Sequence, residues 1–194
     1  MRKKNVREEC VRKLREKALR ARRELGVESR AAASTIICDR VTNTREFRSA
    51  ANIACYIPMN DEVDTRAIIA RAWRANKRVF VPVTRHSGEM FFREIRTDTT
   101  LQRNRMSIWE PDTGDIVAPR FLQLVITPTV AFDRDCNRIG MGGGYYDRCF
   151  AFLRHRKHWL RPKLMGVAFK CQKVEKISPN AWDIRLCRVF TEAN

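Results

Sequence analysis

The amino-acid sequence predicts an α/β fold, a single three-layer domain in which helices cover both faces of a largely parallel central sheet. Short apolar runs rich in strand formers alternate along the chain with stretches of helical period, an alternation typical of parallel sheets. The run "LQLVITP" is apolar throughout, as expected of a strand buried on both faces. No internal repeat or low-complexity linker divides the 194 residues, so we expect one domain over residues 1–194.

The N-terminal segment predicts a basic amphipathic helix over residues 1–25. Its apolar residues recur every three or four positions, and Arg and Lys occupy the other faces. Gly26 follows, a residue type that commonly ends a helix. No apolar run follows the basic start, so we expect no signal peptide. The seven cysteines include no CxxC pair, which favours reduced thiols and a cytoplasmic location.

The remaining elements are expected in a regular order. A second helix should contain "AAASTIICDRV", and "DTRAIIARAWRAN" predicts a third, with Asp64 or Thr65 at its N-cap. Residues 97–120 show no clear period and include two prolines and a glycine, so we expect them to be mostly loop. A further helix should begin at "YYDRCFAFLRH". Strands are expected at "ANIACYIP", "KRVFVPV", "MFFREI", "LQLVITP", "KLMGVAFK" and "CRVFT".

The chain is strongly basic. Lys and Arg number 39 against 22 Asp and Glu, which gives a formal net charge of +17. Such a charge favours anionic partners, which include nucleic acid, nucleotides and polyanionic metabolites, and it does not choose among them. No stretch reaches the roughly 18 apolar residues of a membrane-spanning helix, so we expect no membrane partner.

The sequence "GMGGG" at residues 140–144 is a candidate phosphate-binding loop. Glycine lets the backbone adopt positive φ and lets amide N–H groups approach a ligand without an intervening Cβ. We expect this loop to lead into a helix, whose N-terminus adds further free N–H donors. Phosphate is the ligand that such a site typically binds. The motif differs from both the Walker A and the dinucleotide-binding patterns, and a tight turn without a ligand is the alternative.

Three acidic residues are candidate ligand-binding groups. Asp147 falls in the first turn of the helix after the glycine loop, where it could hold Mg²⁺ beside phosphate or simply interact with the helix dipole. Glu62 lies between a strand and a helix, at the strand end where ligands of α/β sheets bind, or it is an exposed loop acid. Asp183 could be a second metal ligand or an ordinary turn residue.

Several motifs occur together in one order: "RKLR", "YIPMNDEVDT", "NKRVFVPV", "IWEP", "VITPTVAFDRDCNRIGMGGGYYDR", "GVAFKCQKVEKI" and "WDIRLCRVFTE". This series covers nearly the whole chain and resembles the 5-formyltetrahydrofolate cyclo-ligase family. The resemblance implies an ATP- and Mg²⁺-dependent closure of 5-formyltetrahydrofolate to 5,10-methenyltetrahydrofolate with release of ADP and phosphate. In the family's scheme the formyl oxygen attacks the γ-phosphate, and the folate N10 then attacks the activated carbon.

The resemblance also implies roles for particular residues. Catalytic roles would fall to Arg138, Tyr145 and Asp147, and Asp147 and Asp183 would hold Mg²⁺. The residues implied to bind ATP are Arg15, Arg138, Ile139, Gly140, Met141, Gly142, Gly143, Gly144, Tyr145 and Tyr146. Those implied to bind folate are Ile57, Glu62, Met106, Met141, Gly142, Gly143, Gly144 and Tyr145. Val11 stands where relatives often carry a basic residue, a place that Arg12 could fill instead.

Two other functions remain as alternatives. A nucleic-acid-binding protein would use the net charge, but that charge is spread along the chain and accompanies no recognised nucleic-acid motif, so we do not favour it. A relative that binds folate or nucleotide without turnover would not need the retained Asp147 and Glu62. The expected partners are therefore ATP and a reduced folate, whose polyglutamate tail the positive charge could favour, and the expected oligomeric state is a monomer.

Overall fold

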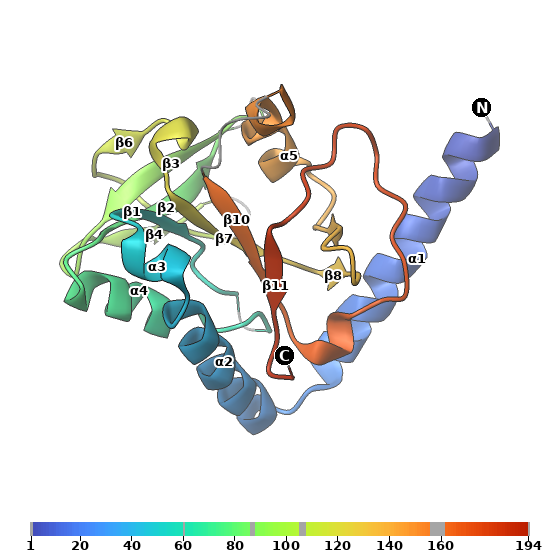
Figure 1. The fold of residues 1–194 in the computed structure, drawn as a ribbon, viewed down its shortest axis with the longest axis horizontal. Coiled ribbons are helices and arrows are strands. Elements are labelled where there is room, and N and C mark those ends of the chain that lie inside the picture. The colour runs from blue at the N-terminus through green and yellow to red at the C-terminus, as the bar shows by residue number, and fades with distance from the viewer. Residues whose placement is uncertain (1, 60, 86–87, 105–107, 156–161, 194) are drawn as a thin grey trace.

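The computed structural model describes residues 2–59, 61–85, 88–104, 108–155 and 162–193. Figure 1 shows a central twisted sheet with helices packed around it and one long helix along its side. The helices are α1 (Arg2–Glu24), α2 (Val27–Thr42), α3 (Arg45–Ser49), α4 (Arg66–Arg74) and α5 (Tyr145–Cys149), with 3-10 turns η1 (Pro119–Phe121), η2 (Ala151–His155) and η3 (Lys170–Gln172). The strands are β1 (Asn52–Cys55), β2 (Arg78–Thr84), β3 (Met90–Ile95), β4 (Leu101–Arg103), β5 (Trp109–Pro111), β6 (Ile116–Val117), β7 (Leu124–Pro128), β8 (Ala131–Phe132), β9 (Arg138–Ile139), β10 (Lys163–Val167) and β11 (Arg188–Phe190).

Within the described part of the chain, seven strands form the main sheet in the order β11-β10-β7-β1-β2-β3-β6. The five strands from β11 to β2 run parallel, while β3 is antiparallel to both of its neighbours. The chain moves from β1 through α4 to β2 on one side, and from β7 to β10 on the other. The sheet therefore reverses its winding direction between β1 and β7, and ligands of open α/β sheets bind outside the carboxyl ends of strands at such a point.

One face of the sheet is covered by α2, α3 and α4. Alternate strand residues point to this face, among them Ile53 of β1 and Leu124 of β7, which are register partners and fully buried. They pack with Ile37 of α2, Phe47 of α3 and Ile68 of α4 in the largest apolar cluster.

The other face has a thinner cover, made by α5, η2 and the segment before β11. The strand residues that alternate with the first set point to this face, including Ala54 of β1 and Phe80 of β2. Phe150, which follows α5, is fully buried against Phe92, and their ring centroids lie 5.8 Å apart. Both faces thus carry helical cover, which confirms the three-layer α/β prediction, although the second layer consists of single turns rather than long helices.

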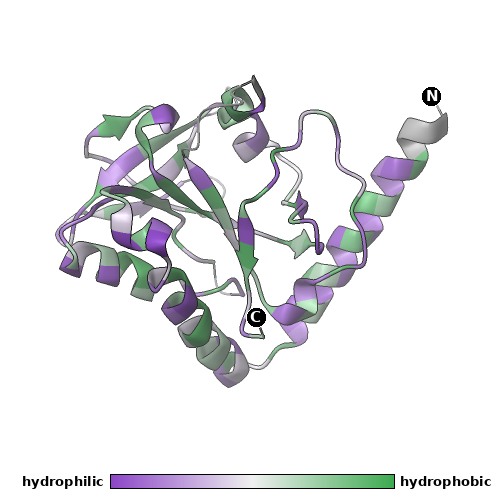
Figure 2. Cartoon of the chain, viewed as in Figure 1, coloured by the Kyte–Doolittle hydropathy of each residue, from purple (hydrophilic) through white to green (hydrophobic). Residues whose placement is uncertain are grey.

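The long helix α1 packs on the small antiparallel ribbon β8–β9 rather than on the main sheet. Ala18 of α1 is buried in a separate apolar cluster with Ile139 of β9 and Ile177. Hydrophilic and hydrophobic colours alternate along α1 in Figure 2, as the amphipathic prediction required. In the described residues no helix has the length and apolar character needed to cross a membrane.

The predicted helices and strands are present, and the structure adds short elements that the sequence did not predict: α3, the β8–β9 ribbon and η3. The helix expected at "YYDRCFAFLRH" is α-helical only as α5 and continues as the 3-10 turn η2. Residues 97–120 contain the short strands β4, β5 and β6, where no period had indicated a strand. Pairs of two or three residues are too short to give a readable alternation. The predicted cap of α4 is shared, because Thr65 holds the N-cap position while the Asp64 side chain accepts from the Arg66 amide.

Candidate active site

A cavity of about 930 Å³ opens at the carboxyl ends of β1 and β7, at the reversal of the sheet. Every predicted site residue within the described ranges lines it, and Met106 lies outside those ranges. These lining residues are Arg15, Ile57, Glu62, Arg138, Ile139, Gly140, Met141, Gly142, Gly143, Gly144, Tyr145, Tyr146, Asp147 and Asp183. The cavity therefore brings the residues expected at ATP and those expected at folate to one place.

The glycine loop forms one wall of the cavity. Gly142 and Gly144 have φ of 106° and 64°, the left-handed region that favours glycine. Gly143 is not in that region, but a Cβ there would lie 2.7 Å from the Tyr145 ring, so close packing rather than φ requires this glycine. The helix that follows has only five residues, so the arginines and loop amides around it must supply most of the positive field.

Arg138 projects from β9 into the same wall. Its guanidinium is 6% exposed, lies 5.3 Å from the Tyr146 ring centroid, and donates from Nη2 to Oδ1 of Asp147 at 3.0 Å. Its Nε is buried without a hydrogen-bond partner in the described part of the chain. A buried donor of this kind suits an anionic oxygen in the cavity, because unpaired buried donors are costly.

Asp147 and Asp183 differ in how far their oxygens are already used. Asp147 accepts from Arg138 and from the Ile184 amide, both at 3.0 Å and both on Oδ1, so Oδ2 keeps no hydrogen bond among the described residues. Asp183 uses both oxygens: Asn180 donates to Oδ2 and Oδ1 at 2.7 and 3.4 Å, and Arg7 lies 3.7 Å from Oδ2. Mg²⁺ commonly takes one or two carboxylate oxygens together with phosphate and water, so Asp147 fits the ion better than Asp183. No group of three or more candidate metal ligands occurs in the described ranges.

Glu62 lines the same cavity from a different segment, the loop after β1. The amide of Met59 donates to its Oε2 at 3.1 Å, and its own amide donates back to the Met59 carbonyl at 3.0 Å. Its side chain is 12% exposed. Burial raises the pKa of Glu62, although the Met59 amide and the Arg22 guanidinium act in the opposite direction.

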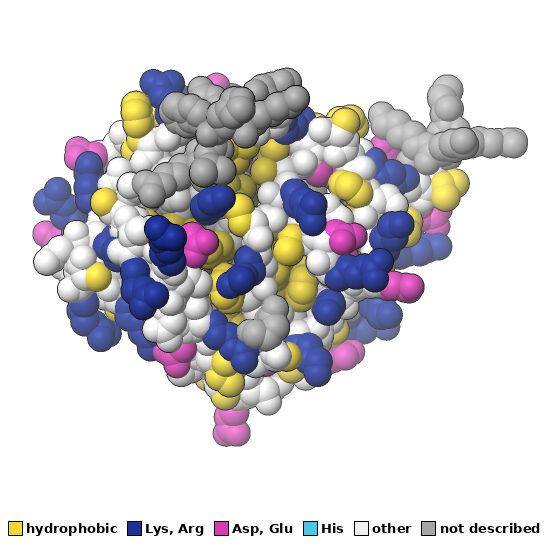
Figure 3. Space-filling view, in the orientation of Figure 1, with side chains coloured by type: hydrophobic (Ala, Val, Ile, Leu, Met, Phe, Trp, Pro, Cys, Tyr) yellow, Lys and Arg dark blue, Asp and Glu magenta, His cyan; other side chains and the backbone are white. Residues whose placement is uncertain are grey.

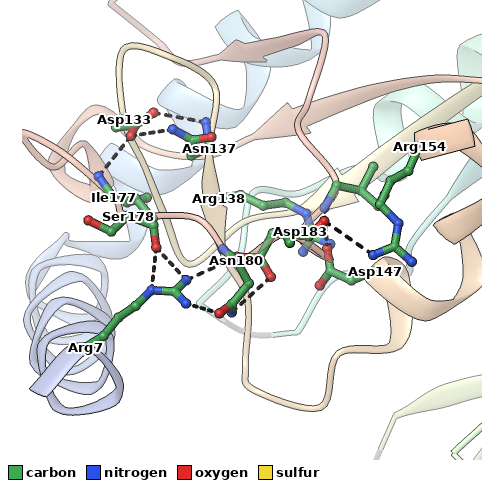
Figure 4. Close-up of polar contacts among 12 residues, drawn as sticks. Arg7, Asp133, Asn137, Arg138, Asp147, Arg154, Ile177, Ser178, Asn180 and Asp183 are labelled. Atoms are coloured by element: carbon green, nitrogen blue, oxygen red, sulfur yellow. Dashed lines mark hydrogen bonds and ion pairs between the residues drawn. The ribbon is translucent and has the colours of Figure 1, made fainter. Parts of the chain in front are cut away.

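Three arginines of α1 reach three different segments around the cavity. Arg15 donates from Nε to the carbonyl of Gly140 at 2.8 Å, which ties α1 to the glycine loop. Arg7 donates to the Ser178 carbonyl at 2.8 Å and also bonds the Asn180 side chain, as Figure 4 shows. Arg22 donates to Asp61, next to Glu62 in the loop after β1. Arg15 had been singled out by the family resemblance, whereas nothing in the sequence separated Arg7 and Arg22 from the other arginines of the helix.

Arg12 does not take the place of the basic residue that Val11 replaces. Its guanidinium pairs with Glu16 at 2.8 Å, and both side chains are more than half exposed. Val11 itself lines the cavity, as does Arg7 one turn earlier. Near Val11, the arginines of α1 that line the cavity are therefore Arg7 and Arg15, not Arg12.

Asp133 is a buried carboxylate to which we assigned no role from the sequence. It accepts from the amides of Asp135, Asn137 and Ile177 and from the Asn137 side chain, at 2.9 to 3.0 Å (Figure 4). Burial alone would raise its pKa, but these bonds outweigh that effect and hold the pKa below its usual value. Asp133 thereby joins the β8–β9 ribbon, which carries Arg138, to the segment that leads to Asp183. An Asp before a short polar turn is the local signal for such bonding.

Further cationic side chains line the cavity. Arg148 lies over the Tyr145 ring, 5.2 Å from its centroid, and donates to the Gly88 carbonyl at 2.9 Å. Arg154 lines the same cavity and donates to the carbonyls of Ala151 and Ala181. The cavity thus has cationic side chains around the glycine loop and a largely buried carboxylate, Glu62, in the loop after β1.

The fold and cavity define an α/β protein with an open cavity at the carboxyl ends of its parallel strands, the place where ligands of such folds bind. A model of the 5-formyltetrahydrofolate cyclo-ligase family matches residues 7–192, and the chain belongs to this family of ligases.

Named relatives agree with this assignment. The 5-formyltetrahydrofolate cyclo-ligase of Haemophilus influenzae is 35% identical over 162 residues, which are 79% of this chain and 82% of that protein. The protein of the same name from Escherichia coli K12 is 38% identical over 146 residues, 73% and 78% of the two chains. The NMR structure of Aquifex aeolicus 5,10-methenyltetrahydrofolate synthetase superposes with a TM-score of 0.81 at 29% identity, covering 95% of this chain and 90% of that one.

Proposed function

We propose that this protein converts 5-formyltetrahydrofolate to 5,10-methenyltetrahydrofolate, with ATP as phosphoryl donor and Mg²⁺ as the metal. The observation that carries the proposal is the single cavity that joins the glycine loop, Arg138 and Asp147 to the buried Glu62. Family membership supports the substrate class. A shared cavity is what transfer of a phosphoryl group from one bound molecule to another requires.

The proposed reaction has two steps. The formyl oxygen attacks the γ-phosphorus of ATP, the bond from that phosphorus to the β–γ bridging oxygen breaks, and ADP leaves. The folate N10 then attacks the activated formyl carbon, loses its proton, and displaces inorganic phosphate by cleavage of the C–O bond. The product is the five-membered methenyl ring, and the formyl oxygen leaves in phosphate.

The residues around the loop suit the first step. Phosphoryl transfer depends on positioning and on neutralising charge more than on a strong base. The backbone of 140–144 would approach the phosphates, with Arg138 stabilising charge and Arg15 fixing the loop through the Gly140 carbonyl. Mg²⁺, held by Oδ2 of Asp147, would neutralise phosphate charge. Tyr145 and Tyr146, which line the cavity, would pack against the ligands.

The other end of the cavity suits the folate ring. A pterin-like ring presents N–H donors on one edge, and an ionised carboxylate such as Glu62 accepts such donors strongly. Ile57 and Met141 line the cavity as apolar contacts for the ring. We keep Met106 as a proposed ring contact and Asp183 as a proposed second metal contact. We also propose a monomer that acts in the cytoplasm.

The distribution of surface charge does not favour nucleic acid. In Figure 3 the Lys and Arg side chains are scattered over the visible face, with acidic and apolar side chains between them, rather than gathered in one stripe. Electrostatic binding of a polynucleotide needs a continuous basic surface.

The test is an assay of the purified protein with 5-formyltetrahydrofolate and MgATP, following the methenyl chromophore and released phosphate together. We expect both signals at equal rates, and neither when ATP is omitted or when the metal is chelated. Absence of the chromophore at every pH and magnesium concentration would contradict the proposal. Isothermal titration with each ligand then identifies a relative that binds without turnover.

A further inference from the structure

Arg22 is a buried arginine near the end of α1 that contacts Asp61 and lies beside Glu62, a residue of the cavity wall. Its residue is 5% exposed, whereas the neighbouring Arg23 has a side chain 70% exposed. Its Nε and Nη2 donate to Oδ2 of Asp61 at 3.1 and 3.0 Å, and its Nη1 lies 3.7 Å from Oε1 of Glu62. Burial of an arginine is costly unless its charge has a specific partner, and here it has two.

We propose that Arg22 is a positioning residue for folate recognition, which fixes the loop through Asp61 and keeps the Glu62 carboxylate charged for the substrate ring. The inference rests on the proposed function, because it acts through the residue assigned to the pterin edge. Arg22 does not line the cavity, so its role is exerted through Glu62 rather than by contact with the ligand.

The distances explain how one arginine serves both acids differently. Asp61 receives direct hydrogen bonds, which anchor the guanidinium. At 3.7 Å the Glu62 oxygen is close enough for charge attraction but beyond hydrogen-bond distance. Since Oε2 already accepts from Met59, Oε1 keeps its acceptor capacity within the described part of the chain. The arginine thus supports the charge without occupying the oxygen that a ring N–H would use.

The surroundings of Glu62 make a compensating cation necessary. Arg22 faces it from α1, Asp61 from its own loop, and the hydroxyls of Tyr56 and Tyr146 from the end of β1 and from α5. Burial raises the pKa of Glu62, Asp61 raises it further, and Arg22 lowers it. Burial also raises the pKa of both tyrosines, so they stay neutral and add no further negative charge beside Glu62. A phenol cannot supply the positive charge, so among these neighbouring groups Arg22 is the cation that does so. Without Arg22 the buried carboxylate would bind a proton more readily and lose acceptor capacity.

The test compares Arg22→Gln and Arg22→Lys with Arg23→Gln, which removes the same charge from the next position of the helix. For Arg22→Gln we expect the KM for 5-formyltetrahydrofolate to rise, by up to about tenfold at acid pH where fewer Glu62 carboxylates stay ionised, while the KM for ATP stays unchanged. Arg22→Lys should recover part of this loss because it restores the charge. Arg23→Gln should match the wild type. Circular dichroism establishes that each variant is folded.

The pH profile separates this role from a purely structural one. A raised pKa of Glu62 should move the acid limb of kcat/KM for folate to higher pH in Arg22→Gln, and the shift should vanish when Glu62→Gln is added. Equal loss for ATP and folate, an unchanged acid limb, or identical behaviour of Arg22→Gln and Arg23→Gln would overturn the inference. A wild-type protein that yields no chromophore overturns the proposed function, and this inference with it.

Discussion

Two carboxylates that line the cavity, Asp147 and Glu62, each lie beside a buried arginine, and the two pairs are built differently. Near the glycine loop, Arg138 donates directly to Asp147 at 3.0 Å. In the loop after β1, Glu62 lies 3.7 Å from Arg22 without a hydrogen bond. The first arrangement orients the carboxylate and leaves one oxygen toward the cavity, as a metal ligand needs. The second maintains a negative charge while leaving an acceptor for a ring donor.

Both arginines are almost fully buried, at 6% and 7% side-chain exposure. Buried ion pairs are weak contributors to stability, since desolvation offsets most of their attraction. Arg138 lines the cavity, and Arg22 lies beside Glu62, which lines it, so both arginines are placed to serve ligand binding rather than folding. Substitutions near the glycine loop should therefore weaken ATP binding or turnover most, and substitutions at Glu62 should weaken folate binding most.

The largest effect should come from the Asp147 end. Asp147→Asn keeps the side-chain shape and can still accept from Arg138, but it removes the charge facing Mg²⁺. We expect kcat to fall roughly 100-fold or more, the usual cost of losing one group that stabilises charge at a reacting centre. Rates measured across magnesium concentrations check this, with Asp135→Asn as an exposed acidic control. A near-wild-type rate at limiting magnesium would contradict the metal assignment.

The second largest effect should come from a substitution in the glycine loop, residues 140–144. Gly143→Val places a branched side chain where even a Cβ would lie 2.7 Å from the Tyr145 ring, so the ring must move. We expect ATP affinity to fall about tenfold or more, while the melting temperature changes by a few degrees only. Gly26→Ala is the control, because nothing lies within 4 Å of its added Cβ. Normal ATP titration by the Gly143 variant would mean that 140–144 is only a turn.

Glu62→Gln should affect folate binding rather than ATP binding, the opposite of the Gly143 variant. Losing a charged hydrogen bond to the ring should weaken folate by ~1.5–3 kcal/mol and leave ATP nearly unchanged. Because Glu62 in the wild type becomes protonated as pH falls through its raised pKa, the difference between wild type and variant should shrink toward acid pH. Isothermal titration with each ligand measures this, with Asp64→Asn as a control outside the cavity. Unchanged folate affinity would remove Glu62 from the site.

The smallest effect should come from Arg7, the arginine of α1 that contacts Asp183. Both side chains are about 30% exposed, and such pairs contribute ~0–1 kcal/mol. Arg7→Gln should lower the melting temperature by about 2–4 °C at most and leave both ligand affinities within threefold of wild type. Calorimetry and titration would check this. A large selective loss of ATP affinity would instead place Arg7 beside Arg138 as a phosphate contact.

Much of the fold could be predicted because the spacing of apolar residues in helices and strands indicates which positions are buried. Ile53, Leu124 and Ile68 were placed in apolar runs, and all three are fully buried. The glycine loop and Glu62 could be proposed because their residue types and positions carry chemical meaning. Arg22 could not be distinguished from Arg20 or Arg23, since a helix surface rich in arginine gives no local sign of which one is buried. The difference lies in tertiary packing: Arg22 is buried and hydrogen-bonds Asp61, 39 positions away, whereas the exposed Arg23 only approaches the same carboxylate at 3.9 Å.

The contacts of α1 also have a consequence for the timing of assembly. Arg7 bonds the Ser178 carbonyl, a sequence separation of 171 residues. At a synthesis rate of ~5–20 residues per second, α1 precedes this partner by on the order of 10 to 30 seconds. The apolar stripe of α1 meets Ile139 and Ile177 only after that interval, so this wall of the cavity is assembled late. A nascent chain would therefore expose the stripe of α1 for longer than any face of the central sheet formed by β1 and β2.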